Sequence, residues 1–318
     1  MSNVAFLWIF SRGMELGVIV LCLLPLRALL RRKVPRLFTY LLWAALPVNV
    51  GYNLIRFLLP KRDTFVSDYV RRTTTIFVSE KAAQILGWIL CCGTALVVFG
   101  MVYTYIRFLQ CLVGSIRLQK DIYLASRIRS PFTLGVFRPR IYLPTSLKEE
   151  YYEAVVLHER VHIARKDVWM KYLAVAFLGL FWFQPVLWFA YRMFINDMEE
   201  ACDETVLHRK GKSYCAEYAR TLVEVSYQAG QVRGVAIGYG NGEVKARVEQ
   251  VMRYERAKTS VKVVAVVICC LFMVLSIPVS WQIPRLVRAE QQEGTRTESM
   301  AVQEKGMEHK TNYWEEAD

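Results

Sequence analysis

The chain has 318 residues, of which 54% are hydrophobic, and it carries a formal net charge of +13 at pH 7. The hydrophobic residues are concentrated in long runs, which is typical of a polytopic membrane protein rather than of a soluble domain. No nucleic-acid-binding motif accompanies the charge, so we predict no direct contact with nucleic acid and assign the basic residues to a lipid bilayer and its cytosolic side.

Three apolar segments in the first third of the chain are predicted to be transmembrane helices. They cover residues 4–30, 37–59 and 82–110, and each is long enough to cross a hydrocarbon layer of about 30 Å. The connection after the first segment is basic and has no acidic residue; its basic residues are Arg27, Arg31, Arg32, Lys33 and Arg36. Because basic loops stay on the cytosolic side, we expect the N-terminus to be external.

Residues 111–260 have a more soluble character and are predicted to form a cytosolic domain. Short β-branched and aromatic runs at 122–124 and 140–143 predict a small β element. Residues 130–139 lie between these runs and contain proline and glycine in a pattern typical of turns. A helix is expected to begin shortly after Pro144.

That helix contains the sequence His158-Glu159-Arg160-Val161-His162, a match to H-E-x-x-H. Residues four apart share one face of a helix, so His158 and His162 can bind one ion. Imidazole nitrogens suit Zn²⁺, and a catalytic zinc site takes three protein ligands and leaves one position for water. Glu159 is in the position of the general base that accepts a proton from this water. On the pentapeptide alone, the alternative is a chance alignment on an ordinary helix.

Residues 168–195 are almost wholly apolar and long enough to cross the membrane. A crossing would place the acidic residues that follow on the opposite side from the two histidines. Gln184-Pro185 lies near the middle of the run, where proline disfavours a continuous helix. We therefore predict two helices that form a re-entrant or interfacial hairpin and return Glu199 to the level of the histidines. A single kinked transmembrane helix is the alternative.

The acidic residues after the hairpin are candidates for the third metal ligand. Glu199 and Asp203 share a helix face, so we predict that Glu199 binds the metal and that Asp203 orients a histidine. Glu200 points about 100° away and is the runner-up ligand. A solvated acidic face is the alternative interpretation, and His208, one turn further on, is interpreted as incidental.

The remaining third of the chain is expected to be mostly helical. Helices are predicted over 202–228 and 243–258, on either side of a Gly-rich loop at 229–242 that we do not interpret. A last transmembrane helix is expected over 261–283. The polar residues 284–318 are predicted to form a disordered external tail, which places both termini outside the cell.

Four sequence motifs, taken in order, resemble those of the BlaR/MecR-type membrane metallopeptidases. They are SPFTLGVFRPRIYLP before the helix, HERVH, the Asp-containing turn at 164–167, and E-x-A-C-D at 199–203. The resemblance covers residues 1–283. It implies a gluzincin-type zinc site with the ligands His158, His162 and Glu199 and with the glutamate between the histidines as base. It also implies an antirepressor-type signal transducer that faces the cytosol and cleaves itself or a repressor.

The antibiotic sensors of this family carry a large external penicillin-binding domain after the last span. Here about 35 residues follow the last predicted span, without an S-x-x-K acylation motif. We therefore expect this chain not to sense β-lactams directly.

The predicted fold is mainly α, with about four transmembrane helices (1–110 and 261–283), the hairpin at 168–195, and a gluzincin-like zinc protease domain with a small β element (111–260). The predicted function is site-specific cleavage of a protein substrate, such as a transcriptional repressor, in membrane signal transduction. The alternative is a non-enzymatic signalling or scaffold protein that retains the protease fold. A homodimer is left open.

Overall fold

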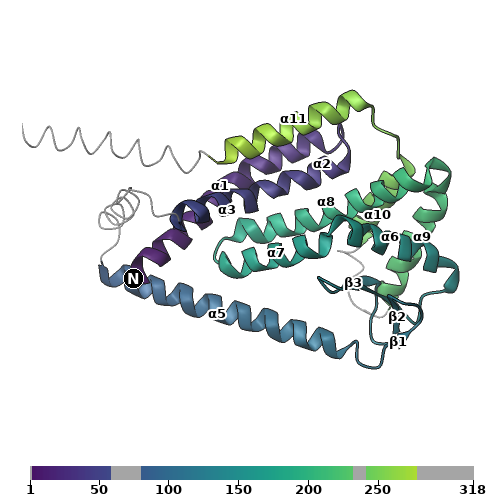
Figure 1. The fold of residues 1–318 in the computed structure, drawn as a ribbon, viewed down its shortest axis with the longest axis horizontal. Coiled ribbons are helices and arrows are strands. Elements are labelled where there is room, and N and C mark those ends of the chain that lie inside the picture. Colours follow the sequence, from purple (N-terminus) through teal and green to yellow (C-terminus); the bar gives the residue numbers. More distant parts are fainter. Residues whose placement is uncertain (1, 59–79, 232–240, 278–318) are drawn as a thin grey trace, which may run out of the picture.

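A computed structural model describes residues 2–58, 80–231 and 241–277, which are mainly helical (Figure 1). The helices are α1 (Ser2–Leu30), α2 (Arg36–Leu41), α3 (Ala45–Leu58), α5 (Glu80–Gln110), α6 (Tyr152–Arg165), α7 (Asp167–Leu180), α8 (Pro185–Lys210), α9 (Cys215–Gln231), α10 (Asn241–Met252) and α11 (Thr259–Ser276). Short 3-10 turns occur at Leu42–Ala44, Glu149–Tyr151 and Lys212–Tyr214. The expected mainly helical class is therefore confirmed. The tail expected over 284–318 and most of the Gly-rich loop lie outside the described residues.

Among the described residues, three helical segments are long and apolar enough to cross a membrane. They are Arg12–Leu30 in α1, Gln84–Gln110 in α5 and Thr259–Ser276 in α11. These segments coincide with three of the four spans expected from the sequence. Helix α11 packs against α2 and α3, and α1 contacts both α5 and α8 (Figure 1).

The segment expected as a second span, residues 37–59, is not one uninterrupted α-helix. It consists of α2 and α3, separated by the 3-10 turn Leu42–Ala44. Pro47 accounts for the interruption, because it has no N–H to donate to the Trp43 carbonyl and its ring crowds that carbonyl. This stretch therefore does not form a fourth long helix of the kind that α1, α5 and α11 provide.

The apolar run at 168–195 folds as a helical hairpin. Helix α7 ends at Leu180 and α8 begins at Pro185, so the break expected at Gln184-Pro185 is confirmed. Gln184 is extended (φ −98°, ψ 100°), as is usual before proline, and Pro185 occupies the first turn of α8, where its missing N–H is tolerated. The Gln184 side-chain amide donates a hydrogen bond of 3.2 Å to the carbonyl of Gly13, which ties the hairpin turn to α1.

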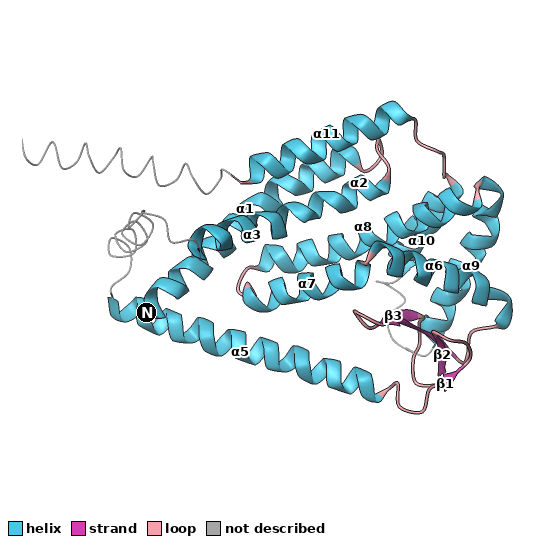
Figure 2. Ribbon diagram, in the orientation of Figure 1, coloured by secondary structure: helices cyan, strands magenta, loops and turns pink. Residues whose placement is uncertain are grey.

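One small sheet lies beside α6 and supplies one wall of the candidate site (Figure 2). Its strands are β1 (Ile116–Arg117), β2 (Ile122–Ala125), β3 (Phe132–Leu134) and β4 (Arg140–Pro144). The strand order is β1-β2-β4-β3; β2 pairs with β4 in parallel and the other pairs are antiparallel.

The expected small β element is confirmed, but it extends into residues 130–139, for which the sequence predicted only turns. Strand β3 forms there because Phe132 pairs with Tyr142 of β4 and their rings stack. The turn that follows depends on Gly135, whose φ of 102° is accessible to glycine at little cost. The proline and glycine residues of 130–139 therefore flank a short strand and do not form only a loop.

Gly93 of α5 lies against the turn of the α7–α8 hairpin, and a side chain there is expected to destabilise the protein. A Cβ atom at Gly93 would overlap the ring of Trp182. Gly93→Val should cost about 1–3 kcal/mol, as overpacking usually does. The control is Gly100→Val in the same helix, where a Cβ atom meets nothing within 4 Å. Thermal unfolding in detergent measures the difference, and equal melting temperatures would contradict close packing at Gly93.

Candidate metal centre

Helix α6 brings two imidazoles to one point. His158 and His162 are one turn apart, and their Nε2 atoms are separated by 3.0 Å. The helix ends at Arg165, and the next residue, Lys166, adopts a left-handed conformation (φ 60°). This sharp end makes Asp167 the first residue of α7 and directs its carboxylate back toward His162, so its Oδ2 lies 2.7 Å from His162 Nδ1.

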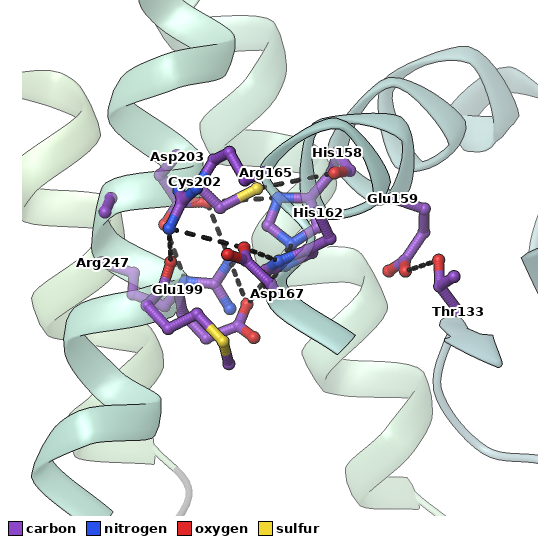
Figure 3. A network of polar contacts seen from close by, with 12 residues as sticks. Thr133, His158, Glu159, His162, Arg165, Asp167, Glu199, Cys202, Asp203 and Arg247 are labelled. Atoms are coloured by element: carbon purple, nitrogen blue, oxygen red, sulfur yellow. Dashed lines mark hydrogen bonds and ion pairs between the residues drawn. The ribbon is translucent and has the colours of Figure 1, made fainter. Parts of the chain in front are cut away.

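The second arm of the hairpin supplies a carboxylate to the same point (Figure 3). Glu199 Oε2 of α8 lies 3.3 Å from His158 Nε2 and 3.6 Å from His162 Nε2. Ligands bound tetrahedrally at about 2.0–2.1 Å from zinc are separated by about 3.3 Å. The three separations of 3.0, 3.3 and 3.6 Å bracket that value, so these atoms fit a zinc ion without a large rearrangement.

Cys202 adds a fourth donor atom to the group. Its sulfur and one nitrogen from each of His158 and His162 all lie within 4.8 Å of one another. The thiol is fully buried and contacts the His158 carbonyl at 3.5 Å. Glu199 lines the neighbouring cavity, whereas Cys202 does not. Sequence reasoning quoted Cys202 only as part of a motif, and its proximity to the imidazoles was missed.

Hydrogen bonds behind the histidines determine which nitrogen carries the proton. The Tyr218 hydroxyl donates its proton to Asp203 Oδ1 at 2.7 Å, so its oxygen can only accept from His158 Nδ1, also at 2.7 Å. His162 Nδ1 likewise donates to the carboxylate of Asp167. In their neutral form, both imidazoles are thereby held with the Nε2 lone pair directed to the shared point, as metal-binding histidines usually are.

Residues outside the predicted set complete these two networks. Tyr40 of α2 donates to Asp167 Oδ1 at 3.1 Å. Arg247 of α10 forms two hydrogen bonds of 2.8 Å with Asp203 and lies 3.6 Å from Glu199 Oε2. Asp203 itself lies 3.5 Å from His158 Nδ1. The sequence had indicated the turn that contains Asp167, but nothing in it distinguished Arg247 from the other basic residues of its helix.

Two residues considered in the sequence analysis lie outside the centre. Glu200 faces away from the imidazoles and pairs with Arg31 and Arg36, because it is on a different side of α8 from Glu199. Its assignment as runner-up ligand is therefore not supported by the geometry. His208 is exposed near the end of α8, as expected for an incidental histidine.

Glu159 lines a cavity of about 190 Å³ together with both histidines and Glu199. Its carboxylate is buried, and its Oε2 accepts a hydrogen bond of 2.7 Å from the Thr133 hydroxyl of β3. Figure 3 shows the Glu159 side chain directed toward Thr133 and away from the imidazoles. Thr133 belongs to the first sequence motif, which had carried no functional assignment.

The charges of the centre are strongly coupled. Burial acts to lower the pKa of His158, but the neighbouring Cys202 and Glu199 outweigh burial and raise the pKa to about 10. Burial acts to raise the pKa of Glu199, but His162, His158 and Arg247 outweigh it and hold the pKa well below its usual value. Protons on the imidazoles and a cation between them therefore compete for the same carboxylate.

Residues 61–251, more than half of the chain, match the family described as BlaR1 peptidase M56. The chain belongs to this peptidase family. The resemblance drawn from the four sequence motifs is thereby confirmed at the level of the family.

Individual relatives cover shorter stretches. The methicillin resistance mecR1 protein of Staphylococcus aureus is 27% identical over 168 residues, which are 49% of this chain and 29% of that protein. The regulatory protein BlaR1 of Bacillus licheniformis is 32% identical over 100 residues, which are 30% of this chain and 17% of that protein. The matched stretches thus span less than a third of the length of either relative.

The metal-free protein is expected to lose stability as pH rises from about 6.5, the ordinary histidine pKa, to about 10, the pKa of His158 in the fold. A group whose pKa is raised on folding stabilises the fold fully below its unfolded pKa, and this contribution disappears as pH passes the folded value. Melting temperatures in the presence of a chelator measure the effect. Glu199→Gln should reduce the decline without abolishing it, because one group that stabilises the charged imidazole is removed while Cys202 remains. An equal decline in both proteins would contradict this.

Proposed function

We propose that the chain is a membrane-embedded zinc metalloendopeptidase whose metal ligands are His158, His162 and Glu199. The observation that carries this proposal is the convergence of their three donor atoms, at spacings close to those of a tetrahedral zinc site, beside the cavity that contains Glu159. Membership of the M56 peptidase family supports the same reaction class.

Zinc held by these ligands would polarise the scissile carbonyl and lower the pKa of the attacking water. Glu159 then accepts a proton from this water and delivers it to the leaving amine. Thr133 holds one oxygen of the Glu159 carboxylate against β3 and so restricts the side-chain rotamer from which the transfer occurs. The hydrogen bonds of Tyr218 and Asp167 keep both histidines in the tautomer that leaves Nε2 unprotonated.

Glu199 is preferred to Cys202 as the third ligand because of its position. It lines the cavity in which a peptide would be cleaved, whereas the Cys202 thiol is fully buried and outside the cavity lining. A catalytic zinc site has to keep one position open to substrate and water. With the Glu199 carboxylate as third ligand, the metal would lie at the cavity wall, and its fourth position would remain accessible to substrate and water.

The proposed arrangement places the catalytic domain, residues 111–260, on the cytosolic side between the spans at 1–110 and 261–283. The α7–α8 hairpin enters the membrane or lies at its surface without crossing. The substrate is this protein itself or a cytosolic repressor-like protein. The relatives named as a regulatory protein and as a methicillin resistance protein are consistent with a role in signalling.

Glu159→Ala is expected to retain zinc and to lower cleavage by about 10²–10⁴-fold, the usual contribution of a general base. Proteomic comparison of cells expressing wild type or variant should reveal a fragment that only the wild type produces. Glu153→Ala, in the same helix but exposed, is the matched control and should leave the fragment in place. If the fragment appears equally with wild type and Glu159→Ala, this chain does not make it through Glu159, and the non-enzymatic signalling protein is favoured.

The third ligand can be identified by zinc titration of the purified protein against a competing chelator. Glu199→Gln should weaken zinc binding by more than the roughly 10–100-fold that follows loss of an outer partner. Cys202→Ser should have a much smaller effect, and His158→Ala provides the reference for a lost ligand. The reverse order of the two effects would assign the third position to the thiol.

A further inference from the structure

Helix α8 has acidic residues on two opposite faces. Successive residues are rotated by about 100°, so Glu199 and Asp203 lie about 40° apart and face α6. Asp197, Glu200 and Glu204 lie about 100–160° from Glu199 and face α1 and α2 instead. The same turns of α8 therefore carry two acidic faces: one faces the two histidines, and the other faces α1 and α2.

The basic end of α1 pairs with this second face. Arg27 Nε and Nη2 lie 2.6 Å from the two oxygens of Asp197, and these side chains are only 7% and 0% exposed. Trp43 Nε1 donates a third hydrogen bond of 2.7 Å to Asp197. A buried carboxylate with three charge-assisted or indole donors is costly to displace, because removing one partner leaves a buried charge uncompensated.

A second pair lies one turn further along α8 and just beyond the end of α1. Arg31 forms an ion pair with Glu200, and Arg36 Nε lies 3.4 Å from the same carboxylate. The backbone N–H of Arg36 donates to Glu204. The acidic residues at 197 and 200 are on either side of Glu199 in the sequence, so holding them fixes the rotation of α8 about its axis at Glu199.

We infer that Arg27 and Arg31, at the end of the first membrane helix, are positioning residues for the metal ligand Glu199. The inference rests on the proposed function. A rotation of α8 that breaks these pairs moves the Glu199 carboxylate out of the 3.3–3.6 Å range in which it meets both imidazoles. These arginines therefore act on the metal through α8 and do not touch it.

This role differs from the one that the sequence indicated for the same residues. A basic cytosolic connection orients membrane helices by its number of charges, so Arg31 and Arg32 should contribute equally. Positioning of Glu199 requires Arg31 and not Arg32, which is exposed and has no ion pair to the described residues. The adjacent arginines are therefore a matched pair for an experiment.

The test is zinc affinity of the full-length protein in detergent, measured against a competing chelator. Arg31→Glu and Glu200→Arg should each weaken binding by about 10–100-fold, as for loss of an outer partner. The double variant should return to within about threefold of wild type, because it restores an ion pair of reversed sense. Arg32→Glu, which changes the charge equally, should leave the affinity unchanged.

A second measurement separates positioning from general destabilisation. In the Glu199→Gln background, Arg31→Glu should cause no further loss of zinc affinity, since the ligand that it positions is already absent. A further loss as large as in the wild-type background would overturn the inference, as would equal effects of Arg31→Glu and Arg32→Glu. If Arg31→Glu does not fold, failure of the double variant to recover folding and zinc binding also overturns it.

These outcomes are distinct from failure of the proposed function. If wild type and His158→Ala bind zinc equally weakly, the metal centre itself is wrong. If wild type binds zinc tightly, His158→Ala does not, and Arg31→Glu behaves as wild type, only the positioning role is wrong.

Discussion

The contact between Glu199 and the two α6 imidazoles depends on the reversal of the chain at Gln184-Pro185. Without the reversal, the apolar run after α6 would carry Glu199 away from the histidines. Proline at the start of α8 ends the first arm, and the Gln184 amide ties the turn to α1. The two arms then run back along each other, so a residue far along α8 meets the helix that precedes α7.

The centre is held from several directions at once. Helix α6 supplies the histidines, α7 supplies Asp167 behind one of them, and α9 supplies Tyr218 behind the other. Arg247 of α10 neutralises Asp203, and β3 supplies Thr133 to Glu159. Each buried charge has a partner of opposite sign or a hydrogen-bond donor, as a low-dielectric interior requires. Elements distant in the sequence are therefore bound together by the polar groups of a single site.

Local pattern was sufficient to predict much of this arrangement. The H-E-x-x-H spacing identified His158, Glu159 and His162, because four residues make about one helical turn. The proline within an apolar run indicated the hairpin, and helix periodicity distinguished Glu199 from Glu200. In each case the informative residues are close in the sequence, so their geometry follows from the helix itself.

Contacts between distant residues could not be read in the same way. Tyr218 and Arg247 reach Asp203 from helices whose packing no periodicity specifies. The arginines near the end of α1 were interpreted from the sequence only as a basic connection on the cytosolic side. Their ion pairs with α8 join residues about 170 positions apart, which the sequence pattern does not reveal. The interruption at Leu42–Ala44 was also missed: Pro47 was noted, but a proline can either kink a helix or interrupt it, and the sequence does not distinguish the two.

The buried sulfur of Cys202 bears on which cations the centre tolerates. Zinc is borderline in softness and accepts nitrogen and oxygen donors readily, whereas softer cations favour thiolate. A cadmium ion that replaced zinc would gain from binding this sulfur in addition to the imidazoles, and its coordination would then be complete without water. A centre that includes this thiol is therefore expected to hold cadmium more firmly than imidazole and carboxylate donors alone would.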